Sequence, residues 1–185
     1  LDAEFWYCEN PYLSIIRSEN SVKSLLYPGF RVPDIREFQM KSTSPVSSAI
    51  HYTLGQKVTF QRQGEYRFLT IPEVHTGLDQ WHLPTLTEKR KTPVEVGWPI
   101  EVGYKYTMTV PESFRLVNDD IDIQKSTDIG SLAIHFNQEN GKIRIDKHIQ
   151  LNQKIIKPAN YEQLKEITNL WFKDNYRHLI FTEKD

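Results

Sequence analysis

The residue types best suited to metal binding or catalysis are the histidines and a short acidic cluster. Zinc sites need His, Cys or carboxylate ligands at short spacings, whereas His75 and His82 have six residues between them and match no common pattern. Asp119, Asp120 and Asp122 bring carboxylates together, but without the spacing and the glycine of a calcium-binding EF-hand loop. We therefore predict no metal site: the histidines are expected to be solvated, and the acidic cluster to be a solvated entry to a strand.

Catalytic patterns are equally weak. The sequence has no glycine-rich phosphate loop and no G-x-S-x-G nucleophile elbow. A glycosidase needs two carboxylates about 5–9 Å apart, and the 24 acidic residues nominate no particular pair. Cys8 ends the apolar run 4–8, where a packing role is favoured over a nucleophilic one. We predict no catalytic residue and no cofactor, and we interpret the basic run 88–91 as a solvated turn.

Aromatic residues, 12% of the chain, are the one feature with binding potential. Tyr104 and Tyr106 share the apolar face of a predicted strand, and Trp171 lies on a predicted helical stripe, so all three are expected in the core. Trp81 and Trp98 lie in segments flanked by proline and glycine. They are the candidate contacts for a sugar ring or a flat protein surface, with a place in the core as the alternative.

Chain length, net charge and hydropathy limit the number of domains and the kinds of partner. A chain of 185 residues suits one domain, or one domain with an appended piece. Its net charge of -1 argues against nucleic acid as a partner, because phosphate binding usually needs a basic surplus. No apolar run reaches about 18 residues, so we predict no membrane span. Leu1 is not an initiator methionine and no signal peptide follows it, as expected of a mature or excised fragment.

Strand patterns dominate the chain, and alanine, the best helix former, is scarce. Residues 101–110 alternate between apolar and polar side chains, which is typical of an antiparallel strand with one wet face. Residues 131–137 and 142–151 flank Asn140-Gly141, a dipeptide that favours a tight hairpin turn. Lys147 interrupts the apolar face of the returning strand, which predicts a bulge or a sheet edge there.

A weaker hairpin is predicted around Gln63-Gly64, from 57–62 and 65–71, and 48–54 would extend it to a meander. Segment 21–27 fits either a short helix or a strand. The other predicted strands are 5–9, 13–17, 35–40, 85–90, 114–117, 120–124 and 177–182.

One amphipathic helix is predicted at about 159–175, with Asn160 and Gln163 as a capping box. The proline- and glycine-containing stretch 92–99 predicts a joint between a β-rich N-terminal part, 1–91, and a C-terminal sandwich part, 92–185. Many short strands separated by turn signals favour a mainly β fold. We therefore predict an antiparallel β-sandwich, immunoglobulin-like or related, with one C-terminal helix.

The order of pieces in the second half carries a resemblance. The pieces are 92–96, 101–106 closing at 110–111, 141–145 leading to 155, 158–161, the helix end 170–171 and the closing strand 179–181. This order resembles the C-terminal β-sandwich domain of unknown function that follows the transglutaminase-like core in large exported bacterial proteins. The resemblance implies a module beside a papain-like Cys-His-Asp domain, in the periplasm or at the cell surface. The family's catalytic residues belong to the core domain, so none is carried over here.

Together these observations favour a non-catalytic accessory or interaction domain. Its expected partners are neighbouring domains of the same polypeptide, and a cell-wall or protein substrate. The alternative is a carbohydrate-binding module that uses Trp81 and Trp98. A third alternative, an enzyme with dispersed acids in a cleft, has no nominated residues.

Overall fold

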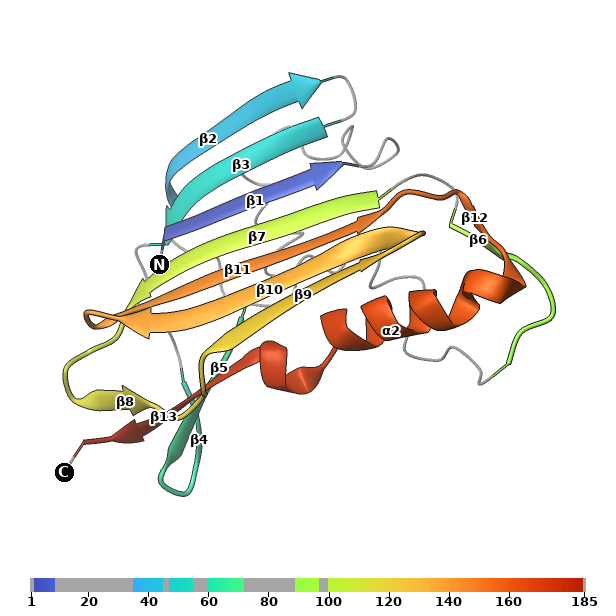
Figure 1. Cartoon of the computed structure of the whole chain (residues 1–185). Coiled ribbons are helices and arrows are strands. Elements are labelled where there is room, and N and C mark those ends of the chain that lie inside the picture. The colour runs from blue at the N-terminus through green and yellow to red at the C-terminus, as the bar shows by residue number, and fades with distance from the viewer. Residues whose placement is uncertain are drawn as a thin grey trace.

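Two antiparallel sheets make up most of the structure (Figure 1). The computed structural model describes residues 2–8, 35–44, 47–54, 60–71, 89–96 and 100–184, the first three ranges through backbone and strand pairing. The predicted mainly β, antiparallel fold with a C-terminal helix is confirmed. No described helix is long and apolar enough to cross a membrane.

The larger sheet has seven strands in the order β2-β3-β1-β7-β11-β10-β9. Every neighbouring pair is antiparallel. Its strands are β1 (Asp2–Cys8), β2 (Ile35–Ser44), β3 (Ser47–Leu54), β7 (Ile100–Thr109), β9 (Ile121–Thr127), β10 (Gly130–Glu139) and β11 (Lys142–Leu151).

The central strands of this sheet follow the predicted alternation. Strand β7 buries Val102, Tyr104, Tyr106 and Met108 on one face, as period-two patterning requires. The predicted hairpin is β10–β11, and it turns at Asn140 (φ 51°) and Gly141 (φ 71°). Both residues take the positive φ of a primed turn, for which Asn-Gly is the favoured pair.

The smaller sheet has the order β4-β5-β13-β8, with β4 (Gln61–Gln63), β5 (Tyr66–Thr70), β13 (His178–Glu183) and β8 (Phe114–Leu116). The hairpin around residue 64 is confirmed, with its turn at Gly64 and Glu65. The predicted meander is wrong, because β3 pairs with β1 and β2 in the larger sheet. Alternation specifies which side chains face the core, but it does not specify the neighbouring strand.

The helix is shorter than predicted: α2 runs over Tyr161–Trp171, between the 3₁₀ turns η3 (Pro158–Asn160) and η4 (Asp174–Tyr176). The predicted capping box is wrong, because the Asn160 side chain makes no capping hydrogen bond. Asn160 has φ -102° and ψ 6°, since the preceding 3₁₀ turn already holds it out of the extended conformation of an N-cap.

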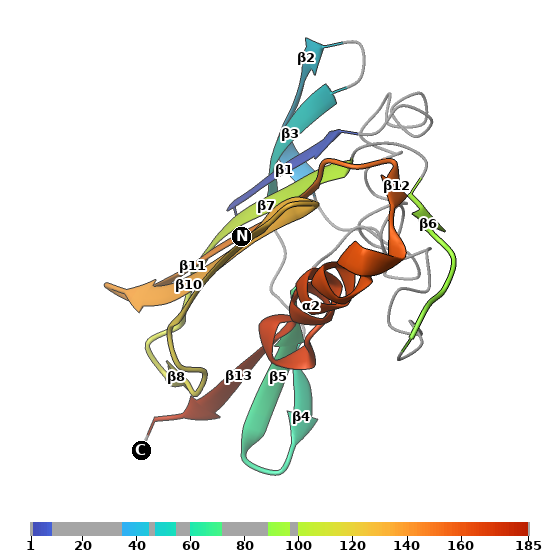
Figure 2. The same cartoon turned by 45° about the vertical axis from the view of Figure 1, so that its right-hand side comes forward.

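Helix α2 covers one face of the larger sheet and leaves the other open. Figure 2 shows α2 and the short pair β6 (Val94–Glu95) and β12 (Ile155–Ile156) on one side, with no described element on the opposite side. Tyr161, Leu164, Ile167 and Trp171 form the buried stripe of the helix. The smaller sheet adds Leu116, Leu179 and Phe181 to the same core cluster. One hydrophobic core therefore joins both sheets and the helix.

Strands from both sides of residue 91 share each sheet, since β1 lies beside β7 and β5 beside β13. The division into parts 1–91 and 92–185 stays a prediction. The strands predicted at 5–9, 35–40, 114–117, 120–124 and 177–182 correspond to β1, β2, β8, β9 and β13. The segments 13–17 and 21–27 lie outside the described residues, as do residues 85–88 of the strand predicted at 85–90. The remaining residues, 89 and 90, belong to no strand.

Candidate functional site

The structure tests the predicted aromatic contacts only in part. Trp81 and Trp98 lie outside the described residues, so their role as ligand contacts stays a prediction. Tyr104, Tyr106 and Trp171 are buried in the core, as predicted. The Tyr104 and Trp171 rings stack with their centroids 5.7 Å apart, which fixes the end of α2 against the sheet.

Lys147 departs most clearly from its prediction. Strand β11 lies between β7 and β10 and pairs residue for residue with both, so Lys147 is neither at a bulge nor at a sheet edge. Its side chain is 0% exposed. Nζ donates a hydrogen bond to the Trp171 carbonyl (3.3 Å) and lies 4.5 Å from the centroid of the Trp171 ring. The lysine is tolerated in the core because these contacts replace its hydration.

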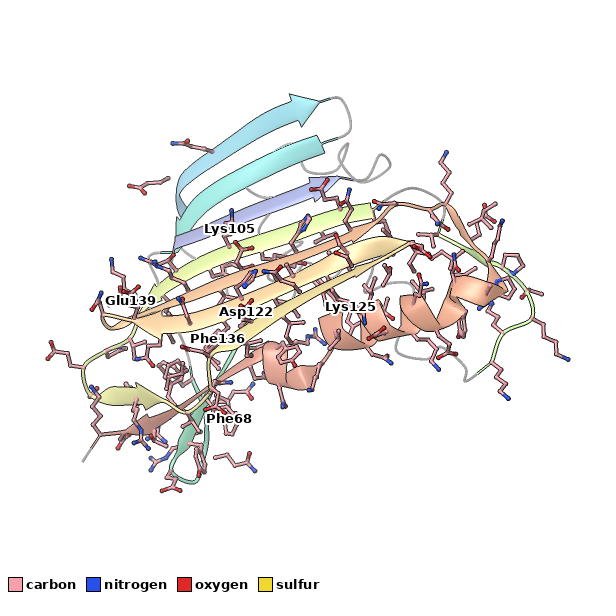
Figure 3. The ribbon with its side chains drawn as sticks, viewed as in Figure 1. Phe68, Lys105, Asp122, Lys125, Phe136 and Glu139 are labelled. Carbon is pink, nitrogen blue, oxygen red and sulfur yellow. The ribbon has the colours of Figure 1, made fainter. Side chains whose placement is uncertain are left out.

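The open face of the larger sheet collects polar side chains from four strands. The registers place Asp122 of β9 opposite His135 of β10, His135 opposite Asp146 of β11, and Asp146 opposite Lys105 of β7. These residues alternate with the buried ones along their strands, so they point away from the core. Figure 3 labels Lys105 and Asp122 on this face. Sequence alternation predicted the polar faces of β7 and of the β10–β11 hairpin, but not the row that the four strands form together.

Ion pairs and histidine–carboxylate contacts cross the open face between neighbouring strands. His135 Nδ1 lies 2.8 Å from Asp122 Oδ1, and Lys105 Nζ lies 3.8 Å from Asp146 Oδ2. His148 Nε2 and Glu101 Oε1 are 3.1 Å apart on the same face. The Asp122 side chain is 78% exposed and that of His135 42%. Contacts this exposed add little to the stability of the fold. Because the Asp122 and His135 side chains are in contact with solvent, a ligand can reach them.

A shallow hollow of about 510 Å³ lies on this face. Its charged lining comes from Lys105, Asp120, Asp122, His135, Arg144 and Asp146. Asp120 enters from the segment before β9, where its Oδ1 accepts a hydrogen bond from the Gln138 N–H (3.2 Å). The acidic cluster is solvated, as predicted, since Asp119, Asp120 and Asp122 are all exposed. Among the residues that the structure describes, no group of three or more His, Cys, Asp or Glu could hold a metal ion.

A second surface lies on the smaller sheet. Tyr66, Phe68 and Ile180 share the face opposite the buried Leu179 and Phe181, and we call these three residues the outer apolar face. Tyr66 is 38% exposed. The three residues lie outside the core cluster and outside the side chains packed against it.

The sequence contained a signal for the outer apolar face that our prediction missed. Tyr66 and Phe68 fall on one face of an extended segment 66–71, and Leu69 and Ile71 fall on the other, so this segment carries apolar residues on both sides. A strand of that kind is expected to be covered on both faces. In the structure one face of β5 lies against the core, and the other carries the outer apolar face.

Comparison with known proteins identifies the domain. The sequence model of DUF3858, a domain of unknown function of which a structure has been solved, matches residues 66–181. The chain belongs to this family. No curated protein matches the chain. The match confirms the predicted likeness to a domain of unknown function. The matched residues include the outer apolar face, α2 and the row formed by Lys105, Asp122, His135 and Asp146 on the open face of the larger sheet.

A solved structure shares the fold. It is a protein from Parabacteroides distasonis described as a "putative protease", with a TM-score of 0.59 and 23% sequence identity. The likeness covers 66% of this chain and 24% of that protein. The DUF3858 chain thus spans about a quarter of the length of that protein.

Proposed function

We propose that this DUF3858 chain is a non-catalytic interaction domain of a larger, exported transglutaminase-like protein, and that it packs against the catalytic neighbour. The structural likeness supports a modular role, because the fold recurs as about a quarter of a longer protein described as a "putative protease". The resemblance in the order of strands and helix supports the transglutaminase-like neighbour. Catalysis, in this proposal, belongs to that neighbour.

The observation that carries the proposal is the outer apolar face. Tyr66, Phe68 and Ile180 lie side by side on β5 and β13, and the Tyr66 and Phe68 ring centroids are 6.4 Å apart. The core cluster buries most of the described large apolar side chains, whereas the neighbouring rings of Tyr66 and Phe68 lie outside it. Contact with another domain would remove these two rings from water. Tyr66 is exposed, and Phe68 and Ile180 are half-buried. Aromatic residues are enriched in the centres of protein interfaces, which supports an interface on this face.

Polar residues border this patch. Gln61 and Gln63 of β4 lie opposite Phe68 and Tyr66, and Thr182 of β13 lies opposite Tyr66 on the other side. An apolar centre with a polar rim is the usual anatomy of an interface. The β4–β5 hairpin extends away from the larger sheet (Figures 1 and 2). The surface is therefore presented where a neighbouring domain can reach it.

Hydrogen–deuterium exchange can test the interface on the full-length parent protein and on the 185-residue chain. We expect the β4–β5 hairpin to exchange more slowly in the parent, because the neighbouring domain covers it. Phe68→Ser should remove this protection. Ile155→Ser is the matched control, since Ile155 is 57% exposed on β12 and lies outside the outer apolar face.

Two results would contradict the proposal. Equal exchange of the hairpin in the parent and in the isolated chain would exclude a covered interface. Turnover of peptide or glycan substrates by the isolated 185-residue chain would exclude a purely non-catalytic role. A Phe68→Ser chain with an unchanged circular dichroism spectrum and melting temperature ensures that lost protection reports the interface rather than unfolding.

A further inference from the structure

We propose that the hollow on the open face of the larger sheet binds a short peptide with free termini, about three residues long. This site lies on a different sheet from the outer apolar face, so it is independent of the proposed domain interface. The hollow measures about 510 Å³, which is within the usual range for small-ligand sites.

The two ends of the hollow carry opposite charge. Asp120 and Asp122 belong to the β9 side. Arg144 and Lys105 belong to the β11–β7 side, where Asp146 offsets one of the two positive charges. Among the side chains that line the hollow, the β9 side is therefore net negative and the β11–β7 side net positive. Glu139 lies outside this lining, beside Arg144. A ligand that carries an ammonium group at one end and a carboxylate at the other matches this arrangement.

The separation of the two ends sets the length of the ligand. Strand β10 lies between β9 and β11, and neighbouring strands are about 4.8 Å apart, so the two ends are roughly 10 Å apart. An extended peptide advances about 3.3 Å per residue. Three residues therefore bring the terminal ammonium beside Asp120 and Asp122 and the terminal carboxylate beside Arg144.

The charged groups at both ends can exchange their present contacts for a ligand. Arg144 Nη1 lies 3.9 Å from Glu139 Oε2, and both side chains are more than 60% exposed (62% and 61%). A contact this long and this exposed contributes little free energy. At closer range a guanidinium and a carboxylate form a stronger, bidentate and charge-assisted pair. Asp122 is 78% exposed and has oxygen lone pairs beyond its contact with His135.

The middle of the hollow offers hydrogen bonds suited to peptide groups. Asn137 of β10 is exposed and lies opposite Arg144 in the register. Its side-chain amide can donate to a peptide carbonyl and accept from a peptide N–H. Charge matching at the ends and this amide in the middle favour a peptide over a neutral sugar, which would leave both charged ends unused.

Isothermal titration calorimetry of the full 185-residue chain with trialanine tests the site. We expect saturable binding with a dissociation constant on the order of 1 mM, because the hollow is shallow and wet. N-acetyltrialanine and trialanine amide, each lacking one terminal charge, should bind about tenfold more weakly. Absence of saturable binding, or equal binding of all three peptides, would overturn the proposal.

Side-chain variants assign each terminus to its end of the hollow. Arg144→Gln should weaken trialanine about tenfold and abolish the preference over trialanine amide. Asp120→Asn combined with Asp122→Asn should abolish the preference over N-acetyltrialanine. Arg115→Gln and Asp128→Asn are matched controls, because both residues are exposed and lie outside the hollow. Equal effects of the control and hollow variants would contradict the assignment.

Discussion

Lys147 Nζ donates a hydrogen bond to the backbone carbonyl of Trp171, the last residue of α2, at 3.3 Å. The carbonyls of the last helical turn have no partner within the helix and carry its negative dipole end. A lysine from the sheet thus satisfies one of these carbonyls. Tyr104, which lies opposite Lys147 on β7, stacks on the Trp171 ring from the same sheet. The end of α2 is therefore fixed by a charge and a ring from neighbouring strands.

Lys147→Ala is expected to lower the free energy of unfolding by about 2–4 kcal/mol, because it leaves a cavity and an unpaired carbonyl. Lys147→Met keeps most of the volume but also leaves the Trp171 carbonyl without its lysine donor, so it is expected to cost about 1–2 kcal/mol, less than the alanine variant. Urea unfolding followed by far-ultraviolet circular dichroism measures both. A methionine variant as unstable as the alanine variant would show that the charge itself stabilises the core.

Gly130→Ala should destabilise the fold more than Gly141→Ala. A Cβ at Gly130 would collide with the backbone carbonyl oxygen of Gln150 on β11, and relieving this overpacking costs about 1–3 kcal/mol. At Gly141 a Cβ meets nothing within 4 Å, and φ is +71°. Alanine there is destabilising only because a non-glycine residue must adopt a positive φ, which costs near the lower end of about 1–2 kcal/mol. Thermal and urea unfolding of the two variants gives the order, and a reversed order would refute the close strand approach at Gly130.

The ion pair between Lys125 and Glu166 should contribute little stability, and less at high salt. Lys125 Nζ on β9 lies 2.6 Å from Glu166 Oε1 on α2, with the side chains 37% and 50% exposed. Glu166→Gln is expected to cost less than about 1 kcal/mol, and 1 M NaCl should reduce that cost by screening. Glu162→Gln, which removes an i,i+3 pair within α2, is the control. A salt-independent loss would point to packing of Glu166 rather than its charge.

Iodide quenching of tryptophan fluorescence separates the core tryptophan from the predicted ligand contacts. A chain that retains only Trp171, which is 2% exposed, should be quenched weakly. The carbohydrate-binding alternative requires strong quenching in chains that retain only Trp81 or only Trp98, and a fluorescence shift on adding an oligosaccharide. Protection of both Trp81 and Trp98 would remove the basis of that alternative.

The sequence by itself determined the local elements. Period-two alternation predicted β7 and the β10–β11 hairpin, and Asn140-Gly141 located the turn between β10 and β11. The apolar stripe of α2 was recognisable for the same reason. Backbone sterics and the burial of one face act over a few residues, so the pattern is complete within each segment.

The tertiary structure decided which strands meet. Strand β1 lies between β3 and β7, and β5 lies beside β13, more than a hundred residues further along the chain. Many pairings satisfy the same alternation, and only the packing of the whole core selects among them. The row of charges on the open face depends on that selection, because its members come from β7, β9, β10 and β11.

Lys147 shows the same difference between what the sequence determines and what the tertiary structure decides. The sequence placed a charge on an apolar face and so predicted an edge or a bulge. Its partner, the carbonyl of Trp171, lies on another element, so no local pattern could reveal it. A buried charge is tolerated where a partner replaces its water, and the position of that partner is fixed only when the helix packs on the sheet.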